Sequence, residues 1–271
     1  MKFGLIHYNT PGETLEAFLD YAAEAGFDGV ELQIRDVWDE ANPDDRPEDR
    51  AWQVRQLVVE RGLFVGALSA GNDFLNADGR VITAQANRLD RVAGIARQLG
   101  CSVLRCDGGW ERQGKEIPPQ DRWADAIASG FRQALPFLKR HGVCVGLDNH
   151  GTTTNDAEFQ MKVLGMVGSC RVGTVMDTMN YRWMGHDIPT CNRFYELSAL
   201  RAVHVHLKDG TGSRGDYKGC VLGEGEIDLA HGVRALKAAG YQGLWCAEYE
   251  GKDPAGYTRC LEWMKENVPK L

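Results

Sequence analysis

Short apolar stretches alternate with longer amphipathic stretches along all 271 residues of the chain. Most of the short stretches follow a glycine or a polar turn, as in Leu99-Gly-Cys101. A glycine at that place is typical of the left-handed residue that follows a helix, and a short apolar run after it indicates a buried strand. We expect eight strands, at Phe3–His7, Gly29–Ile34, Leu63–Ser69, Cys101–Cys106, Val143–Asp148, Val172–Asp177, Ala202–Leu207 and Leu244–Tyr249.

The longer stretches have the periodicity of helices that cover a sheet. Within Arg80–Gln98, for example, Leu89, Val92, Ile95 and Ala96 recur near one face at a period close to 3.6 residues. We expect eight helices, at Thr14–Glu24, Arg46–Arg61, Arg80–Gln98, Arg122–Arg140, Asp156–Met166, Asn192–Ala199, Leu229–Ala238 and Tyr257–Glu266.

Eight strands that are each followed by a helix predict a single (β/α)8 TIM barrel over residues 1–271. The alternative is a doubly wound open sheet, which predicts a Gly-x-Gly-x-x-Gly motif after the first strand. The sequence there is His7-Tyr-Asn-Thr-Pro-Gly12, which does not match this motif. The barrel is therefore the preferred architecture.

The charge and composition of the chain exclude several classes of protein. The 31 Lys and Arg residues are outnumbered by 38 Asp and Glu residues, for a net charge of −7. This balance argues against a nucleic acid or an anionic membrane as partner. The chain shows no signal-peptide pattern and no apolar run long enough for a membrane span. Its eight cysteines form no Cys-x-x-Cys pair, so we expect free, mostly buried thiols in a reducing cytoplasm.

Polar residues collect where the predicted strands end, which in a TIM barrel is where the active site lies. The fifth, sixth and eighth strands each offer a carboxylate, and the seventh offers a histidine. Three oxygens and one nitrogen suit Mn²⁺, and also Co²⁺, Zn²⁺ or Mg²⁺. Carboxylates that converge on one point repel each other unless a cation or protons intervene. The pattern therefore predicts a site for one divalent metal ion.

Five motifs between residues 147 and 250 extend this pattern: Leu147-Asp-Asn-His-Gly151, Val175-Met-Asp-Thr-Met-Asn180, Val203-His-Val-His-Leu-Lys-Asp209, Gly223-Glu-Gly-Glu-Ile-Asp228 and Gly240-Tyr-Gln-Gly-Leu-Trp-Cys-Ala-Glu-Tyr-Glu250. In this order and spacing they resemble the sugar phosphate isomerase/epimerase family of xylose isomerase-like TIM barrels. That family includes ketose 3-epimerases, hydroxypyruvate isomerase and inosose dehydratase. The resemblance covers essentially the whole chain.

The resemblance implies particular roles for residues of this chain. The metal ligands would be Asp148, Asp177, His206 and Glu248, and Glu248 and Asp148 would also be the acid/base pair. The family usually has Glu where this chain has Asp148, so a shorter side chain must reach the substrate, and His150 is the alternative base. The expected substrate-binding residues are Lys208, Arg214, Asn180 and Glu31. Asn180 stands where epimerases often carry a histidine.

Simpler structural roles compete with some of these assignments. Glu31 can orient a neighbouring residue, Lys208 can form an ion pair with a nearby acid, and His150 can be a hydrogen-bonding histidine beside the metal. For His204, a hydrogen-bonded residue of the barrel interior is the favoured interpretation.

The expected function is a metal-dependent isomerase or epimerase that abstracts a proton next to the chelated carbonyl of a keto sugar or related polyol ketone. One alternative is a dehydratase or lyase acting on a keto sugar or inosose. Another alternative is a barrel that binds a sugar without turnover. The presence of Asp148 where the family usually has Glu is compatible with this alternative. Family members are often dimers or tetramers, so a homo-oligomer is compatible with the resemblance.

Overall fold

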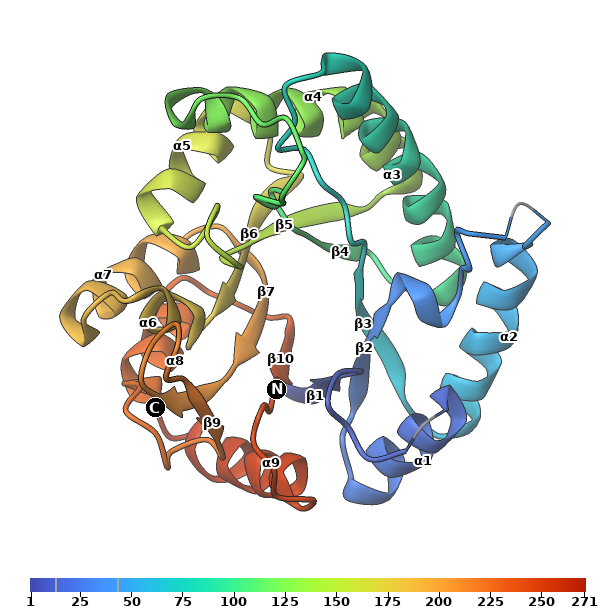
Figure 1. Ribbon diagram of the computed structural model, residues 1–271. Helices are drawn as coiled ribbons and strands as arrows, with labels where there is room; N and C mark the ends of the chain where they lie inside the picture. The colour runs from blue at the N-terminus through green and yellow to red at the C-terminus, as the bar shows by residue number, and fades with distance from the viewer. Residues whose placement is uncertain (13, 43) are drawn as a thin grey trace.

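Eight parallel strands close into a barrel in the computed structural model, which describes residues 1–12, 14–42 and 44–271 (Figure 1). Around the barrel the order is β1-β10-β7-β6-β5-β4-β3-β2, so the first and last strands pair and close the sheet. The strands are β1 Lys2–Ile6, β2 Gly29–Gln33, β3 Phe64–Ser69, β4 Val103–Cys106, β5 Cys144–Asp148, β6 Val172–Asp177, β7 Ala202–Leu207 and β10 Leu244–Ala247. The predicted (β/α)8 barrel is confirmed.

Helices form an outer ring around this barrel (Figure 1). They are α1 Leu15–Ala25, α2 Pro47–Glu60, α3 Gly79–Leu99, α4 Trp123–His141, α5 Ala157–Val167, α6 Asn180–Met184, α7 Ile188–Ala199, α8 Leu229–Ala238 and α9 Gly256–Asn267, with 3-10 turns η1 Ile34–Asp36 and η2 Gln120–Arg122. Within the described residues, no helix is both long and apolar enough to span a membrane. All eight cysteines are free thiols, and Cys170 is exposed.

Helix α7 begins at Ile188 rather than at the predicted Asn192. The Asp187 side chain accepts a hydrogen bond from the backbone nitrogen of Thr190, and Pro189 lies in the first turn. An aspartate cap followed by proline is a strong helix start. The predicted start at Asn192 missed this cap, because it lies in the polar residues that precede the apolar pattern.

A two-stranded antiparallel sheet follows β7 and was not predicted. It pairs β8 Asp209–Thr211 with β9 Lys218–Cys220. The Asp209 carboxylate accepts hydrogen bonds from the backbone nitrogens of Gly223 and Gly225, at 2.8 and 3.0 Å. The hairpin and the glycine-rich loop are therefore organised around one buried carboxylate, which hydrophobic periodicity does not report.

The interior of the barrel is apolar at the amino-terminal ends of the strands and charged at their carboxyl ends. At the amino-terminal end Leu244 fills the centre, where a Cβ on either Gly4 or Gly66 would lie 2.5 Å from the leucine Cδ2. Nearer the carboxyl end the interior residues are charged or polar, and none of these residues is more than 9% exposed: Glu31, Arg105, Asp148, Asp177, His204, His206, Lys208 and Glu248. Buried charges are costly unless they are paired or ligated, so this upper layer needs an explanation beyond packing.

Gly130 of α4 allows the β3–α3 loop to pack closely on that helix. A Cβ at this position would overlap the ring of Phe74, which is fully buried and meets Phe131 edge-on at 5.0 Å. Overpacking of this kind costs about 1–3 kcal/mol. We expect Gly130→Ala to lower the free energy of unfolding by that amount in urea titrations.

The matched control is Gly165→Ala in α5, an exposed helical site with no neighbouring atom within 4 Å of the added Cβ. Alanine has the higher helix propensity, by roughly 1 kcal/mol, so this variant should be slightly stabilised. Equal effects of the two substitutions would contradict the packing argument.

Candidate metal centre and active site

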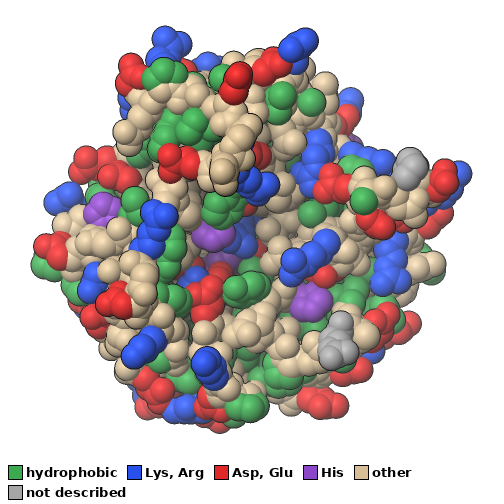
Figure 2. All heavy atoms as spheres, in the orientation of Figure 1, with side chains coloured by type: hydrophobic (Ala, Val, Ile, Leu, Met, Phe, Trp, Pro, Cys, Tyr) green, Lys and Arg blue, Asp and Glu red, His purple; other side chains and the backbone are tan. Residues whose placement is uncertain are grey.

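A cavity of about 270 Å³ opens at the carboxyl end of the barrel. It is lined by Ile6, Tyr8, Gln33, Arg35, Ser69, Gly71, Arg105, Asp107, His150, Glu248 and Glu250. Figure 2 shows acidic, basic and histidine side chains around a hollow at the centre of the barrel face. The cavity therefore lies where a TIM barrel carries its active site.

Asp177, His206 and Glu248 come together at the edge of this cavity. Asp177 and His206 are register partners at the ends of β6 and β7, and Glu248 directly follows β10, the other neighbour of β7. One donor atom from each side chain lies within 4.8 Å of the other two. Strand pairing thus brings three of the four predicted metal ligands into one buried cluster.

Two of these side chains each have one heteroatom fixed by a neighbour and one left over. Asp177 Oδ1 accepts from the backbone nitrogens of Met179 and Asn180, both at 2.8 Å, and Oδ2 has no hydrogen-bond partner. His206 Nε2 lies 2.6 Å from Glu31 Oε2, and Nδ1 has no hydrogen-bond partner. Each side chain is therefore fixed in position, and each has one buried atom that makes no hydrogen bond and could bind a metal ion.

Glu248 repeats this arrangement. Its Oε1 accepts from Lys208 Nζ at 2.9 Å, and its Oε2 has no hydrogen-bond partner. Glu248 Oε2 and His206 Nδ1 are 2.9 Å apart without hydrogen-bond geometry. Buried polar atoms without a partner cost about 1–3 kcal/mol each, and one cation would satisfy all three. The residues present therefore fit a divalent metal ion, and two oxygens with one imidazole nitrogen suit Mn²⁺, Co²⁺, Zn²⁺ or Mg²⁺.

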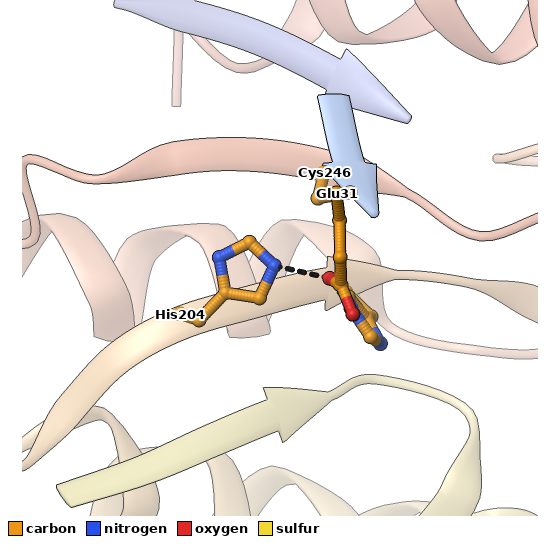
Figure 3. Close-up of side chains that lie close together, drawn as sticks. Glu31, His204 and Cys246 are labelled. Carbon is orange, nitrogen blue, oxygen red and sulfur yellow. Dashed lines mark hydrogen bonds and ion pairs between the residues drawn. The ribbon is translucent and has the colours of Figure 1, made fainter. Parts of the chain in front are cut away.

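Glu31 lies beneath this cluster and accepts from two histidines. Its Oε2 is 2.7 Å from His204 Nε2 and 2.6 Å from His206 Nε2. Figure 3 marks the contact with His204 and shows Cys246 next to Glu31. These four residues could by type hold a metal themselves. However, both contacts to Glu31 Oε2 have hydrogen-bond geometry, so in this structure the two imidazoles already satisfy that oxygen.

These hydrogen bonds determine how His206 presents its ring. A proton on Nε2, donated to Glu31, leaves the Nδ1 lone pair facing Asp177 and Glu248. Glu31 itself is 0% exposed and is not among the residues that line the cavity. The structure therefore gives Glu31 a different place from the expected substrate contact, and agrees with the alternative in which it orients a neighbour.

Asp148, the fourth predicted ligand, lies apart from the other three. It ends β5, and its Oδ2 accepts from Arg105 Nε at 2.7 Å, whereas Oδ1 is buried without a hydrogen-bond partner. Its donor atom groups with Asp107 and His150. Asp148 would have to move to bind the same ion as Asp177, His206 and Glu248. Its side chain is one methylene shorter than that of glutamate, which is consistent with this shorter reach.

His150 lies on the cavity wall opposite the charged end of β10. Its Nδ1 is 3.0 Å from Asp107 Oδ1, and its ring meets Trp110 edge-on at 4.7 Å. The side chain is 37% exposed. Burial alone would lower the pKa of His150, but the hydrogen bond to Asp107 and the charge of Asp148 raise it. A histidine oriented by a carboxylate and open to a cavity is suited to proton transfer.

The pKa values of Asp177, His206 and Glu248 show that this cluster is stabilised by positive charge. Burial and the Glu248 charge raise the pKa of Asp177 to about 6, although Lys208 opposes the rise. Burial alone would lower the pKa of His206, but the carboxylates of Glu31 and Glu248 raise it to about 10. Burial also opposes ionisation of Glu248, but Lys208 and His206 hold its pKa well below the usual range. A divalent cation at this point would take the place of a proton on His206.

The remaining predicted residues divide into buried and exposed positions. Lys208 Nζ contacts Glu248 at 2.9 Å, Glu250 at 3.1 Å and Asn180 Oδ1 at 3.4 Å, so it lies in a buried ion-pair network behind the cavity-lining Glu248 and Glu250. Arg214 lies in the turn between β8 and β9, exposed, and outside the described lining of the cavity. The structure therefore does not bring Arg214 to the site.

Two further residues at the end of the fourth strand belong to the site. Arg105 is the partner of Asp148, and Asp107 is the partner of His150. Both end or follow β4, so the rule that polar residues at strand ends build the site already covered them. The sequence did not predict their contacts with residues at the end of β5, because these contacts depend on which way the side chains of two neighbouring strands point.

The chain belongs to the xylose isomerase-like TIM barrel family, whose model matches residues 19–267. It is 23% identical over 270 residues to L-ribulose-5-phosphate 3-epimerase UlaE of Escherichia coli (strain SMS-3-5 / SECEC), a match that covers 96% of this chain and 92% of that protein. The expected family is thereby confirmed.

Solved structures share the fold. The IolI protein with a bound zinc atom superposes with a TM-score of 0.80 at 18% identity, covering 100% of this chain and 99% of the other. An L-ribulose 3-epimerase superposes with a TM-score of 0.76 at 18% identity, covering 99% and 95% of the two chains.

Replacement of Glu31 tests the arrangement beneath the cluster. Glu31→Gln removes the charge that fixes the proton on His206 Nε2, so we expect the dissociation constant for Mn²⁺ to rise about 10–100-fold, as is usual when a partner of a metal-binding histidine is lost. Isothermal titration calorimetry measures this directly. Glu262→Gln, an exposed change on α9, should leave Mn²⁺ binding unaltered. Wild-type affinity in Glu31→Gln would show that Glu31 does not orient His206.

Proposed function

We propose that this protein is a divalent-metal-dependent isomerase or epimerase of a keto sugar or related polyol ketone. The observation that supports it most is the convergence of three buried atoms without a hydrogen-bond partner, Asp177 Oδ2, His206 Nδ1 and Glu248 Oε2, beside a cavity. The relatives named above are epimerases of L-ribulose or its 5-phosphate, which supports a keto sugar as substrate.

Asp177, His206 and Glu248 would hold the ion, with Asp148 as a fourth ligand if its free Oδ1 turns towards them. Mn²⁺ is our preferred ion for this oxygen-rich set, and Co²⁺, Mg²⁺ and Zn²⁺ are the alternatives. When bound, such an ion supplies Lewis acidity that favours loss of a proton next to a ketone. The zinc atom in the IolI structure is in keeping with a metal site on this fold.

Glu248 and His150 would transfer the proton. Glu248 borders the cavity and is kept ionised mainly by Lys208, so it can accept a proton from a carbon of the bound sugar. His150 also lines the cavity and is oriented by Asp107, so it can return a proton from another direction. Return to the opposite face of the same carbon gives epimerisation, and return to the neighbouring carbon gives isomerisation.

Elimination is a second candidate that one observation favours. The second oxygen of Asp148 is engaged by Arg105, which leaves a histidine rather than a carboxylate as the partner of Glu248. The pKa of His150 is raised, so it can deliver a proton to a departing hydroxyl. Loss of that hydroxyl next to the carbanion would make the reaction a dehydration.

Deuterium exchange tests the proposed function. Mn²⁺-loaded protein in D₂O should incorporate deuterium next to the carbonyl of a ketopentose or ketohexose, detected by loss of the corresponding proton signal in NMR. We expect Glu248→Gln to lower the exchange rate about 10²–10⁴-fold, the usual contribution of a general base.

The control for this experiment is Glu262→Gln on the surface of α9, which should exchange at the wild-type rate. Absence of exchange in the Mn²⁺-loaded wild type with every ketose tested would argue for a sugar-binding barrel without turnover. Unchanged exchange in Glu248→Gln would exclude Glu248 as the base.

A further inference from the structure

Arg105 is a buried cation that the proposed chemistry does not yet use. It belongs to β4, and its side chain crosses the barrel interior between two carboxylates. Its Nε donates to Asp148 Oδ2 at 2.7 Å, and its Nη1 lies 3.7 Å from Glu31 Oε1. Only 10% of the side chain is exposed, and that part lines the cavity.

Most hydrogen-bonding capacity of Arg105 is unused. A guanidinium carries five N–H donors, and the hydrogen bond to Asp148 uses the one on Nε. Within the described residues, Nη1 and Nη2 donate no hydrogen bond. A nine-tenths buried guanidinium with free donors at a cavity wall is a place where an oxygen atom of a ligand is expected.

The contact with Arg105 also limits what Asp148 can do. In Asp148, Oδ2 is occupied by Arg105 and only Oδ1 remains. Asp148 therefore fixes the orientation of the guanidinium through Oδ2.

Building on the proposed function, we propose that Arg105 is a substrate-binding residue whose Nη nitrogens donate hydrogen bonds to an oxygen of the bound keto sugar. That oxygen is a hydroxyl or the oxyanion that forms as the neighbouring carbon loses its proton. The guanidinium is the right group for this position, because it stays charged and can bind Asp148 with one edge and the sugar with the other.

The test removes and then restores the guanidinium. In Mn²⁺-loaded Arg105→Ala, the dissociation constant for the ketose that the wild type binds best among a panel of ketopentoses and ketohexoses should rise at least tenfold. Millimolar guanidinium ions should recover a large part of that loss, whereas equal ammonium chloride should not. Arg105→Lys should recover less than added guanidinium, because an ammonium cannot bind Asp148 and the sugar through one planar group.

Two controls separate ligand binding from structural damage. Arg97→Ala removes an exposed arginine from α3 and should bind both ligands as the wild type does. Calorimetry with Mn²⁺ alone should show that Arg105→Ala still binds one ion per chain, because Asp177, His206 and Glu248 are unchanged. Circular dichroism should report an unaltered fold.

The outcomes distinguish the two proposals. Wild-type sugar affinity in Arg105→Ala, or a loss that guanidinium does not restore, would overturn the role of Arg105 and leave the proposed function intact. A wild type that binds ketoses in an Arg105-dependent way but exchanges no deuterium would support Arg105 and refute turnover. A wild type that binds no ketose of the panel would refute both.

Discussion

The upper half of the barrel interior is charged, and the requirement that each buried charge meets an opposite charge governs the site. A carboxylate moved into a protein interior alone loses several kcal/mol of hydration. Glu31 is therefore matched by two histidines, Asp148 by Arg105 and Glu248 by Lys208. These pairings fix the side chains in position before any ligand arrives.

These pairings leave three buried side-chain atoms without hydrogen bonds, and their positions indicate a site for a metal ion. After the fixed partners are counted, one side-chain N or O atom on each of Asp177, His206 and Glu248 has no hydrogen bond, and the atoms of His206 and Glu248 lie 2.9 Å from each other. A purely structural polar cluster would be expected to satisfy those atoms within the protein. Their convergence beside a cavity is the reason to regard the cluster as a binding site whose ligands are already in place.

Much of the fold and part of the site could be predicted from the sequence. The barrel was predictable because each strand and helix carries its own hydrophobic period, and strand ends such as Asp177 and Glu248 identified where the site lies. The hairpin of β8 and β9 escaped prediction because Asp209 organises it through backbone nitrogens.

The pairing of residues within the site also lay beyond the sequence. Glu31 was readable as a polar strand residue, but its burial beneath His206 depends on the opposite wall of the barrel. The link between Arg105 and Asp148 depends on two neighbouring strands whose side chains share the interior. Residue spacing along one strand cannot report contacts of this kind.

The most direct test of this account is an anomalous difference map from crystals grown with Mn²⁺ and measured near the manganese edge. The account predicts one strong peak within bonding distance of Asp177, His206 and Glu248, and no peak between Glu31 and His204. A structure without density at the three residues despite millimolar Mn²⁺, or with the ion bound at Glu31 and His204, would contradict it.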